Sequence, residues 1–219
     1  MVIGKKKFYN SKTKTSASHY QTSRETVEIN KRMNELIAFI NNFQELDIET
    51  EEAIKKYFVK ETFKKNEFVV EEGKICSKVC FIKSGLVRRF YFEDGEDITK
   101  WIYTNNQFII SLSSFFEQKP SFEYFQACEE TVVYSLSYSD EQILLEYPLF
   151  SKFHIKQLRL YLSKINEFHH LYKLMNAQEK YLYLLHSFPQ IIQKAKLKHI
   201  ASLMDISQET LSRIRASIN

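Results

Sequence analysis

The chain is short of the residues on which covalent and metal frameworks are built. Only three of its 219 residues are cysteines, Cys76, Cys80 and Cys128, and no two of them form a C-x-x-C pair. An odd set without paired spacing gives no disulfide framework and fits reduced thiols in the cytoplasm. No histidine lies between Thr62 and Tyr138. This absence argues against a metal-dependent cupin enzyme, which needs two or three histidines on its barrel strands.

Long apolar runs and catalytic motifs are also absent. The longest apolar runs are far too short to cross a membrane, and the lysines near the N-terminus have no apolar stretch behind them, so no secretory signal is expected. No P-loop, G-x-S-x-G or paired-carboxylate pattern occurs in a plausible context. The sequence therefore predicts a cytoplasmic protein that is not an enzyme and uses neither a cofactor nor a metal.

Charge is distributed unevenly along the chain. The total is +4, but residues 1–32 carry a net charge of +6, residues 33–150 carry −9 and residues 151–219 carry +7. An acidic body with a basic C-terminal end suits a protein whose C-terminus meets phosphates while the rest stays away from them. Residues 1–32 are rich in Lys, Ser and Thr and lack an amphipathic period, so a basic, disordered extension is expected there.

Residues 62–138 have the pattern of short strands. Runs of Val, Phe, Ile and Tyr are separated by turns at Gly73, Gly85 and Asp94-Gly95. The run LVRRFYFEDGEDITKWIY predicts a β-hairpin about the Asp94-Gly95 turn, and FEYFQACEETVVYSLSY predicts two further strands. Six to eight strands at this spacing indicate a jelly roll or an antiparallel barrel.

A long helix is predicted over residues 150–175. Large side chains recur there at spacings of three and four, as in the a/d seam of a coiled coil. A helix that lies on its own domain has the same pattern, but here other faces of the helix also carry leucines. We therefore expect two partners, the strand domain and the same helix of a second subunit. The predicted dimer seam consists of Leu158, Tyr161, Ile165, Phe168, Tyr172 and Met175.

Residues 197–219, LKHIASLMDISQETLSRIRASIN, predict two short helices joined by a tight turn. Ala201 is small where a second helix must cross closely. Asp205 tolerates the left-handed backbone conformation that such a turn requires. Ser207 offers an N-cap, and Glu209 favours the positive end of the second helix. The apolar positions form one face on each helix, Ile200, Leu203 and Met204 on the first and Leu211 and Ile214 on the second.

This spacing predicts a helix-turn-helix whose second helix, about residues 208–217, enters a DNA major groove. An ordinary helical hairpin that caps a core is the alternative, but the free face of the second helix keeps its polar side chains. The guanidinium fork of Arg213 matches the two acceptors at the edge of guanine. Base contacts are expected from Gln208, Glu209, Ser212 and Arg213, and phosphate contacts from Lys196, Lys198, Ser207 and Arg215.

A strand barrel, a seam helix and a helix-turn-helix, in that order, resemble the Crp/Fnr family of bacterial transcription regulators. The most specific pieces are a G-x11-G pattern from Gly73 to Gly85, around VCFIKSGLVRRF, and LKHIASLMDISQETLSRIR at the end. Only HSFPQIIQKAK separates the helix at 177–187 from the helix-turn-helix. This short connection is similar to a branch of the family with a short DNA-binding domain. The resemblance implies an α+β fold with an N-terminal double-stranded β-helix (jelly-roll, cyclic-nucleotide-binding-like) domain at 33–148, a dimerisation helix at 149–176 and a C-terminal helix-turn-helix domain at 177–219.

The nucleotide pocket of that family has a Gly-Glu pair at a phosphate-binding turn and an Arg-Ser pair further on. The matching positions here hold Ile110 and Ser111, and then Ser121 and Phe122. Because a cyclic phosphate needs a guanidinium fork or glycine-backed N–H donors, this degenerate effector pocket is not expected to bind cyclic AMP. The surrounding apolar and aromatic side chains are expected to be mostly core, and a small apolar effector stays open.

These patterns predict a homodimeric, sequence-specific regulator of transcription that binds a palindromic operator in double-stranded DNA. RNA polymerase and an unidentified small-molecule effector are further expected partners, and a membrane is not. The alternative is an effector-binding module that has lost DNA binding and acts through a protein partner. The two hypotheses differ in whether the exposed face of Gln208, Glu209 and Arg213 points away from the dimer seam in both subunits.

Overall fold

The computed structural model describes residues 33–218, and the extension predicted for residues 1–32 lies outside them. Contacts divide the chain into residues 1–34 and residues 35–219, and the second part has the fold described below. Two helices come first, α2 (Asn34–Asn41) and α3 (Ile48–Tyr57). The side chain of Asp47 caps α3 by accepting a hydrogen bond from the backbone N–H of Thr50 at 2.8 Å.

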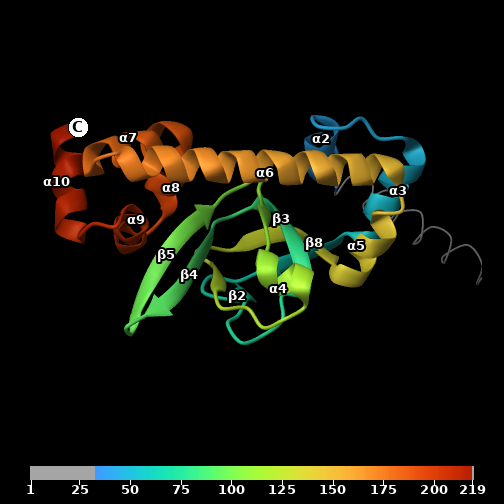
Figure 1. Cartoon of the computed structure of the whole chain (residues 1–219), viewed down its shortest axis with the longest axis horizontal. Helices are drawn as coiled ribbons and strands as arrows, with labels where there is room; N and C mark the ends of the chain where they lie inside the picture. Colours follow the sequence, from blue (N-terminus) through green and yellow to red (C-terminus); the bar gives the residue numbers. More distant parts are fainter. Residues whose placement is uncertain (1–32, 219) are drawn as a thin grey trace, which may run out of the picture. The chain divides into compact units, whose positions relative to one another are not determined.

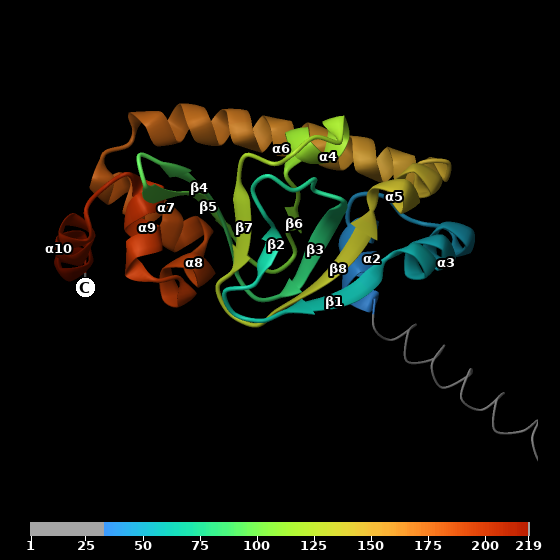
Figure 2. The ribbon, with the colours of Figure 1, turned by 90° about the horizontal axis from the view of Figure 1, so that it is seen from below.

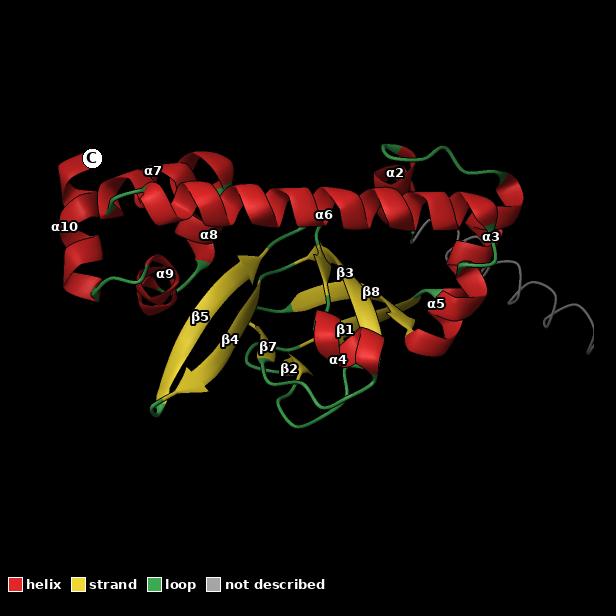
Figure 3. Cartoon of the chain, viewed as in Figure 1, coloured by secondary structure: helices red, strands yellow, loops and turns green. Residues whose placement is uncertain are grey.

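Eight strands follow within the described residues and form two antiparallel four-stranded sheets, in the orders β1-β8-β3-β6 and β2-β7-β4-β5 (Figures 1 and 3). This arrangement is the β-sandwich, or jelly roll, that the strand spacing predicts, and we call it the roll. The strands are β1 (Val59–Phe63), β2 (Phe68–Val70), β3 (Lys78–Ser84), β4 (Val87–Glu93), β5 (Glu96–Tyr103), β6 (Phe108–Ile109), β7 (Tyr124–Ala127) and β8 (Thr131–Ser137).

The hairpin of β4 and β5 forms around the turn predicted for it. Asp94 and Gly95 both have positive φ angles, 51° and 84°, which suit a two-residue turn between twisted strands. A register shift after Arg89 interrupts the pairing of the two strands. At the start of β4, Gly85 has a φ of 122°, and a Cβ there would lie 2.7 Å from the Cα of Thr131. Only glycine fits this turn without a shift of the backbone.

Apolar side chains from both sheets fill the interior of the roll. Ile82, Val87, Phe115, Phe125 and Val133 are completely buried there. Each such side chain contributes about 1.5–3 kcal/mol relative to remaining in water, so this cluster is the main source of stability for the roll. The short helix α4 (Leu112–Glu117) closes the interior between β6 and β7.

A long helix, α6 (Pro148–Leu174), follows the roll and a connecting helix, α5 (Tyr138–Leu144). Pro148 is well placed in the first turn of α6, because proline lacks only an N–H that has no helical partner there. Figures 1 and 2 show α6 passing along the roll from α5 to the C-terminal helices. The long helix predicted over residues 150–175 is therefore confirmed, with slightly earlier ends.

Four helices complete the described chain, α7 (Ala177–Ser187), α8 (Pro189–Lys194), α9 (Leu197–Met204) and α10 (Gln208–Ile218). The helix α8 was not predicted. It begins at Pro189 and buries Ile191 and Ile192, so the segment between α7 and α9 is more ordered than its sequence indicates. These helices share one apolar cluster with Leu86 and Ile102 of the roll. Within residues 33–218 no strand follows β8.

The connection between α9 and α10 has the local geometry that the sequence predicts. Asp205 ends α9 in the left-handed conformation, with φ 57° and ψ 48°. Ser207 then caps α10, its Oγ accepting from the backbone N–H of Thr210 at 3.2 Å. Ala201 is almost fully buried and its carbonyl accepts from the N–H of Ile206 at 3.1 Å. The predicted turn and cap are both confirmed.

Candidate functional site

The predicted effector positions lie where β6 passes into α4 and where α4 is followed by β7. The structure brings Ser111 and Ser121 together inside the roll, with their Oγ atoms 3.1 Å apart and both side chains buried. Phe122 instead lies on the surface, 59% exposed, and Ile110 is half-buried. Only the two serines of the four predicted positions therefore share an internal site.

An ion pair between a buried acid, Glu123, and a half-buried cation, Arg89, accompanies the two serines. The Glu123 side chain is 4% exposed and accepts from the Nε of Arg89, a residue of β4, at 2.5 Å. Its other carboxylate oxygen accepts from Ser111 Oγ at 3.1 Å, and Ser121 Oγ donates to the Glu123 carbonyl at 2.8 Å. The interior at this end of the roll is therefore polar and charged, which corrects the expectation of a purely apolar pocket without a guanidinium group.

Sequence reasoning missed both members of this pair, although one signal was available. Arg88 and Arg89 are adjacent on β4, and neighbouring residues of a strand point to opposite faces of a sheet. One of the two guanidinium groups must therefore face inward, where it needs a buried acid. The sequence alone does not show that Glu123 is that acid.

Two tyrosines connect the ion pair to α6. Tyr103 of β5 and Tyr161 of α6 both interact with Arg89, and the two phenols also interact with each other. Burial raises the pKa of both phenols, so both stay protonated. Tyr161 was predicted to be a seam residue, and the structure places it over the polar interior of its own roll.

In this cluster the Arg89 guanidinium, the group that could bind a cyclic phosphate, is already paired with Glu123. Glu123 and Arg89 satisfy each other, and a cyclic phosphate would have to displace the carboxylate to reach the guanidinium. Leaving one partner of the pair unsatisfied costs about 1–3 kcal/mol.

Two further predicted seam residues also contact their own chain. Phe168 lies edge-on to Trp101 of β5, with ring centroids 5.0 Å apart, and stacks on Tyr172 at 4.6 Å. The hydroxyl of Tyr172 donates to the carbonyl of Leu203 at 3.3 Å. Leu158, Ile165 and Met175 are half-buried. Elsewhere on α6, large apolar side chains are exposed, namely Ile155, Leu160, Leu162 and Leu174.

The predicted base-contacting residues share the free side of α10. Gln208, Glu209, Ser212 and Arg213 are all exposed, while Leu211 on the opposite side is completely buried. Hydrogen bonds from its own backbone N–H and from Ser207 lower the pKa of Glu209. Of the predicted phosphate contacts, Lys196, Lys198 and Ser207 are exposed and Arg215 is half-buried. The structure therefore leaves this polar surface open.

Polar contacts fix α9 against the outer face of the β4–β5 hairpin, and sequence reasoning missed all of them. The backbone N–H of Thr99 donates to Ser202 Oγ at 2.9 Å. Arg88 is 3% exposed, and its Nη1 donates to Asp97 Oδ1 at 2.8 Å and lies 3.0 Å from His199 Nδ1. Burial, and then the Arg88 guanidinium, lower the pKa of His199 to about 4. His199 is therefore neutral at pH 7, and its Nδ1 accepts from Arg88.

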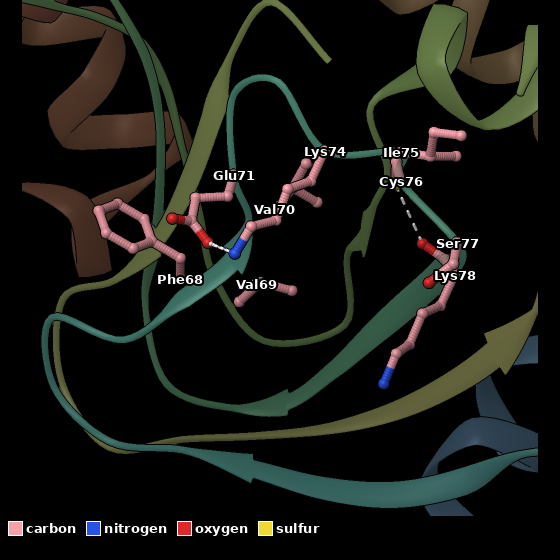
Figure 4. A pocket seen from close by; sticks show the side chains of 9 residues that line it. All are labelled: Phe68, Val69, Val70, Glu71, Lys74, Ile75, Cys76, Ser77 and Lys78. Carbon is pink, nitrogen blue, oxygen red and sulfur yellow. Dashed lines mark hydrogen bonds and ion pairs between the residues drawn. The ribbon is translucent and has the colours of Figure 1, made fainter. Parts of the chain in front are cut away.

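A cavity of about 200 Å³ lies under β2 and the loop that follows it (Figure 4). One stretch of chain lines it, residues 68–71 and 74–78, and none of the predicted site residues is among them. Cys76 is buried beside the cavity and its Sγ donates to the carbonyl of Lys78 at 3.3 Å. At the rim, Lys74 pairs with Glu71. Cys76, Lys74 and Glu71 therefore have their partners within the chain itself.

Over residues 33–218 no helix is both long and apolar enough to span a membrane. In the same part of the chain, no group of three or more His, Cys, Asp or Glu side chains is placed to hold a metal ion.

Residues 60–147 match the family model of the cyclic nucleotide-binding domain. No curated protein has a significant sequence match to the chain. Among solved structures, the fold is similar to that of the c-di-GMP-responsive global regulator CLP of Xanthomonas campestris, with a TM-score of 0.60 and 15% identity over 78% of this chain and 91% of that one. FixK2 of Bradyrhizobium japonicum gives 0.59 and 15%, covering 74% and 84%.

The catabolite activator protein of Thermus thermophilus gives a TM-score of 0.50 and 19% identity, covering 80% of this chain and 85% of that one. At these identities the likeness establishes the fold. Residues 60–147 are therefore similar to a cyclic nucleotide-binding domain, and the roll with the helices that follow it resembles these three solved structures in fold.

Proposed function

We propose that the chain is a homodimeric, sequence-specific DNA-binding regulator of transcription whose effector is not cyclic AMP. The observation that carries the proposal is the pair α9 and α10. Asp205 and Ser207 hold the two helices at a three-residue turn, and Leu211 fixes the buried side of α10. The opposite side presents Arg213 and its polar neighbours to solvent. This is the arrangement by which a helix-turn-helix offers its second helix to a major groove.

Charge and fold support the same function. The segment 151–219 carries a net charge of +7, which suits contact with phosphates. The similar folds include regulators of gene expression. Only the short helix α8 lies between α7 and α9, so a DNA-binding domain without a β-hairpin ahead of its helix-turn-helix is part of the proposal. A module that had lost DNA binding has no comparable support, because the polar face of α10 is open.

A second copy of the chain is the proposed partner of α6. Ile155, Leu158, Leu162 and Ile165 recur at spacings of three and four, which places them on one side of the helix. Ile155 and Leu162 are exposed, so this side is open in the single chain. Tyr161 and Phe168, in contrast, are used within the chain. The seam is therefore proposed to be centred on Leu158, Leu162 and Ile165.

The roll is proposed to be a scaffold or a sensor of something other than cyclic AMP. The Arg89–Glu123 pair would have to separate before a cyclic phosphate could reach the guanidinium. Calorimetric titration with cyclic AMP and cyclic GMP is expected to show no binding at micromolar concentrations. A micromolar dissociation constant for either nucleotide would contradict this part of the proposal.

Selection of bound DNA from a random pool tests the function as a whole. A dimer with one α10 per half-site is expected to enrich a palindrome whose half-site centres lie about 34 Å apart, one turn of the DNA helix. Enrichment of no sequence, with binding that depends only on salt, would reject sequence-specific regulation. Enrichment of a single half-site without symmetry would reject the dimer.

A further inference from the structure

A second cavity, of about 200 Å³, lies between the roll and the C-terminal helices. The connection between β1 and β2 contributes Lys65, the β4–β5 hairpin contributes Arg88 and Asp97, and the segment at α8 and α9 contributes three lysines. We call this cavity the basic cleft, defined by Lys65, Arg88, Asp97, Lys194, Lys196 and Lys198. Its cations come from three separate parts of the fold, so it is not the charged face of one helix.

The charges in the basic cleft are not balanced. Lys194 pairs with Glu129 at 2.8 Å, and Lys198 lies 3.8 Å from Asp97. Neither Lys65 nor Lys196 has an ion-pair partner among residues 33–218. Cations gathered in a hollow with protein walls create a positive potential that attracts anions more strongly than the same cations on a convex surface.

Arg88 gives a second and independent indication of an anion. Its Nη1 has three acceptors within 3.3 Å, on Asp97, Thr99 and His199, but only two N–H groups to satisfy them. Its Nε is buried and has no hydrogen-bond partner in the described part of the chain. A buried N–H donor without a partner is costly. A small rotation that turned the Nε edge of the guanidinium toward an acceptor in the basic cleft would remove that cost.

We propose that the basic cleft binds the phosphate group of a small anion, with Arg88 as the fork and Lys65 and Lys196 as the flanking charges. A guanidinium edge matches the oxygen spacing of phosphate, and lysines add charge without fixed geometry. The cleft is smaller than the 300–1,000 Å³ that encloses most organic ligands. It therefore encloses the phosphate or diphosphate itself, and any attached group extends into solvent.

One consequence rests on the proposed function. Lys196 and Lys198 are also the residues proposed to contact DNA phosphates. An anion in the basic cleft would occupy these lysines and hold α9 against the β4–β5 hairpin. Anion and operator would then compete, and the cleft would be a place where a phosphorylated small molecule lowers affinity for DNA.

Calorimetric titration of the full chain with inorganic pyrophosphate at low salt tests the site. Lys65→Ala is expected to weaken binding about fivefold, as for the loss of one partly exposed ion pair. Lys64→Ala is the matched control, because it removes the same charge from the neighbouring exposed residue, which does not line the cleft. No binding by the unmodified chain, or equal weakening by both variants, would overturn the proposal.

Arg88→Lys is a second variant that keeps the charge and removes the Nε–H. It is expected to weaken pyrophosphate binding while circular dichroism shows an unchanged fold, and unchanged binding in a folded variant would reject the role of Arg88. Titrations with adenosine monophosphate and with adenosine test whether the phosphate or the nucleoside is recognised. Binding of the nucleotide but not the nucleoside supports recognition of the phosphate, whereas equal binding of both would contradict it.

Competition is measured separately, by the effect of pyrophosphate on operator affinity in the unmodified chain and in Lys65→Ala. A smaller effect in the variant supports the shared use of the lysines. If no operator exists, calorimetry still decides the anion site. If calorimetry shows no binding of the anion, DNA selection still tests the proposed function.

Discussion

Arg88 and His199 meet where α9 packs on the β4–β5 hairpin, with the Nη1 of Arg88 3.0 Å from the Nδ1 of His199. The two residues are 111 positions apart in sequence. A protonated imidazole could not accept this hydrogen bond and would place a second cation beside a buried guanidinium. Packing of the C-terminal helices on the roll therefore depends on a neutral histidine.

Acid is expected to weaken this packing through His199. The pKa of His199 is lowered to about 4, mainly by burial, while an unfolded histidine titrates near 6.5. Between these values the unfolded chain binds the proton and the folded chain does not, so stability falls as the pH falls from about 6.5 to 4. Arg88, Lys196 and Lys198 add to the effect, and Asp97 opposes it.

Urea unfolding at a series of pH values measures this contribution, which is about 3 kcal/mol at most. His199→Gln is expected to reduce the fall in the free energy of unfolding between pH 6.5 and pH 4. His186→Gln, at an exposed histidine, is the control and should show the same pH dependence of the free energy of unfolding as the unmodified chain. Equal slopes for all three proteins would show that His199 does not titrate in this way.

Glu141 is expected to act in the opposite direction. Burial raises the pKa of this carboxyl to about 7, and lowers the pKa of His154, whose Nδ1 lies 3.6 Å away. Burial therefore favours the uncharged form of both groups over an ion pair. The folded chain keeps the Glu141 proton longer than the unfolded chain, so stability falls as the pH rises from about 4.5 to 7.

Glu141→Gln removes this titration and is expected to make the chain more stable at pH 7 relative to pH 5 than the unmodified protein. The same urea measurements detect the change. Glu146→Gln, at an exposed position nearby, should leave the pH dependence as it was. A pH profile unaltered by Glu141→Gln would mean that the carboxyl is ionised at an ordinary pH.

Removing Glu123 is expected to destabilise the roll. Glu123→Ala leaves the half-buried Arg89 as an unpaired charge beside Tyr103 and Tyr161, at a cost of about 1–3 kcal/mol. Glu117→Ala, at an exposed glutamate of α4, should change stability by less than about 1 kcal/mol. Replacing both partners, Arg89→Met with Glu123→Leu, should recover most of the loss. A single Glu123→Ala as mild as the control would contradict the role of the pair.

Dimerisation is expected to depend on one side of α6. Leu162→Glu places a charge at the centre of the proposed seam and should give a monomer in sedimentation experiments, because an unpaired charge between apolar helices is costly. Leu160→Glu is the matched control, since Leu160 is an exposed leucine outside the seam. A monomeric unmodified chain, or dissociation by both variants alike, would reject the seam.

Local features of the fold followed from the sequence because their causes are local. Asp205 and Ser207 act within a few residues of themselves, and the hairpin turn needs only Asp94 and Gly95. The apolar spacing of α6 predicted a helix with two partners. It did not assign side chains to partners, because residues three and four apart follow more than one side of a helix, and Phe168 turned out to contact Trp101.

Polar pairs distant in sequence could not be predicted in the same way. Arg89 and Glu123 are 34 positions apart, and no sequence pattern near either residue identifies the other as its partner. Strand alternation shows that one arginine of β4 faces inward, but it does not show which one. In the structure Arg89 faces Glu123 in the interior of the roll, and Arg88 faces His199 of α9. The structure brings Ser111 and Ser121 together inside the roll, but the sequence did not predict the Arg89–Glu123 charge pair beside them.

Binding of the selected operator and of each single-base variant, by the unmodified chain and by Arg213→Ala, tests the central claim most directly. The account predicts that Arg213→Ala loses about 1–3 kcal/mol and no longer distinguishes the base at one position in each half-site. Lys60→Ala, which removes an exposed charge on β1, should keep the full base preference. An unchanged base preference in Arg213→Ala would contradict the reading of DNA by α10.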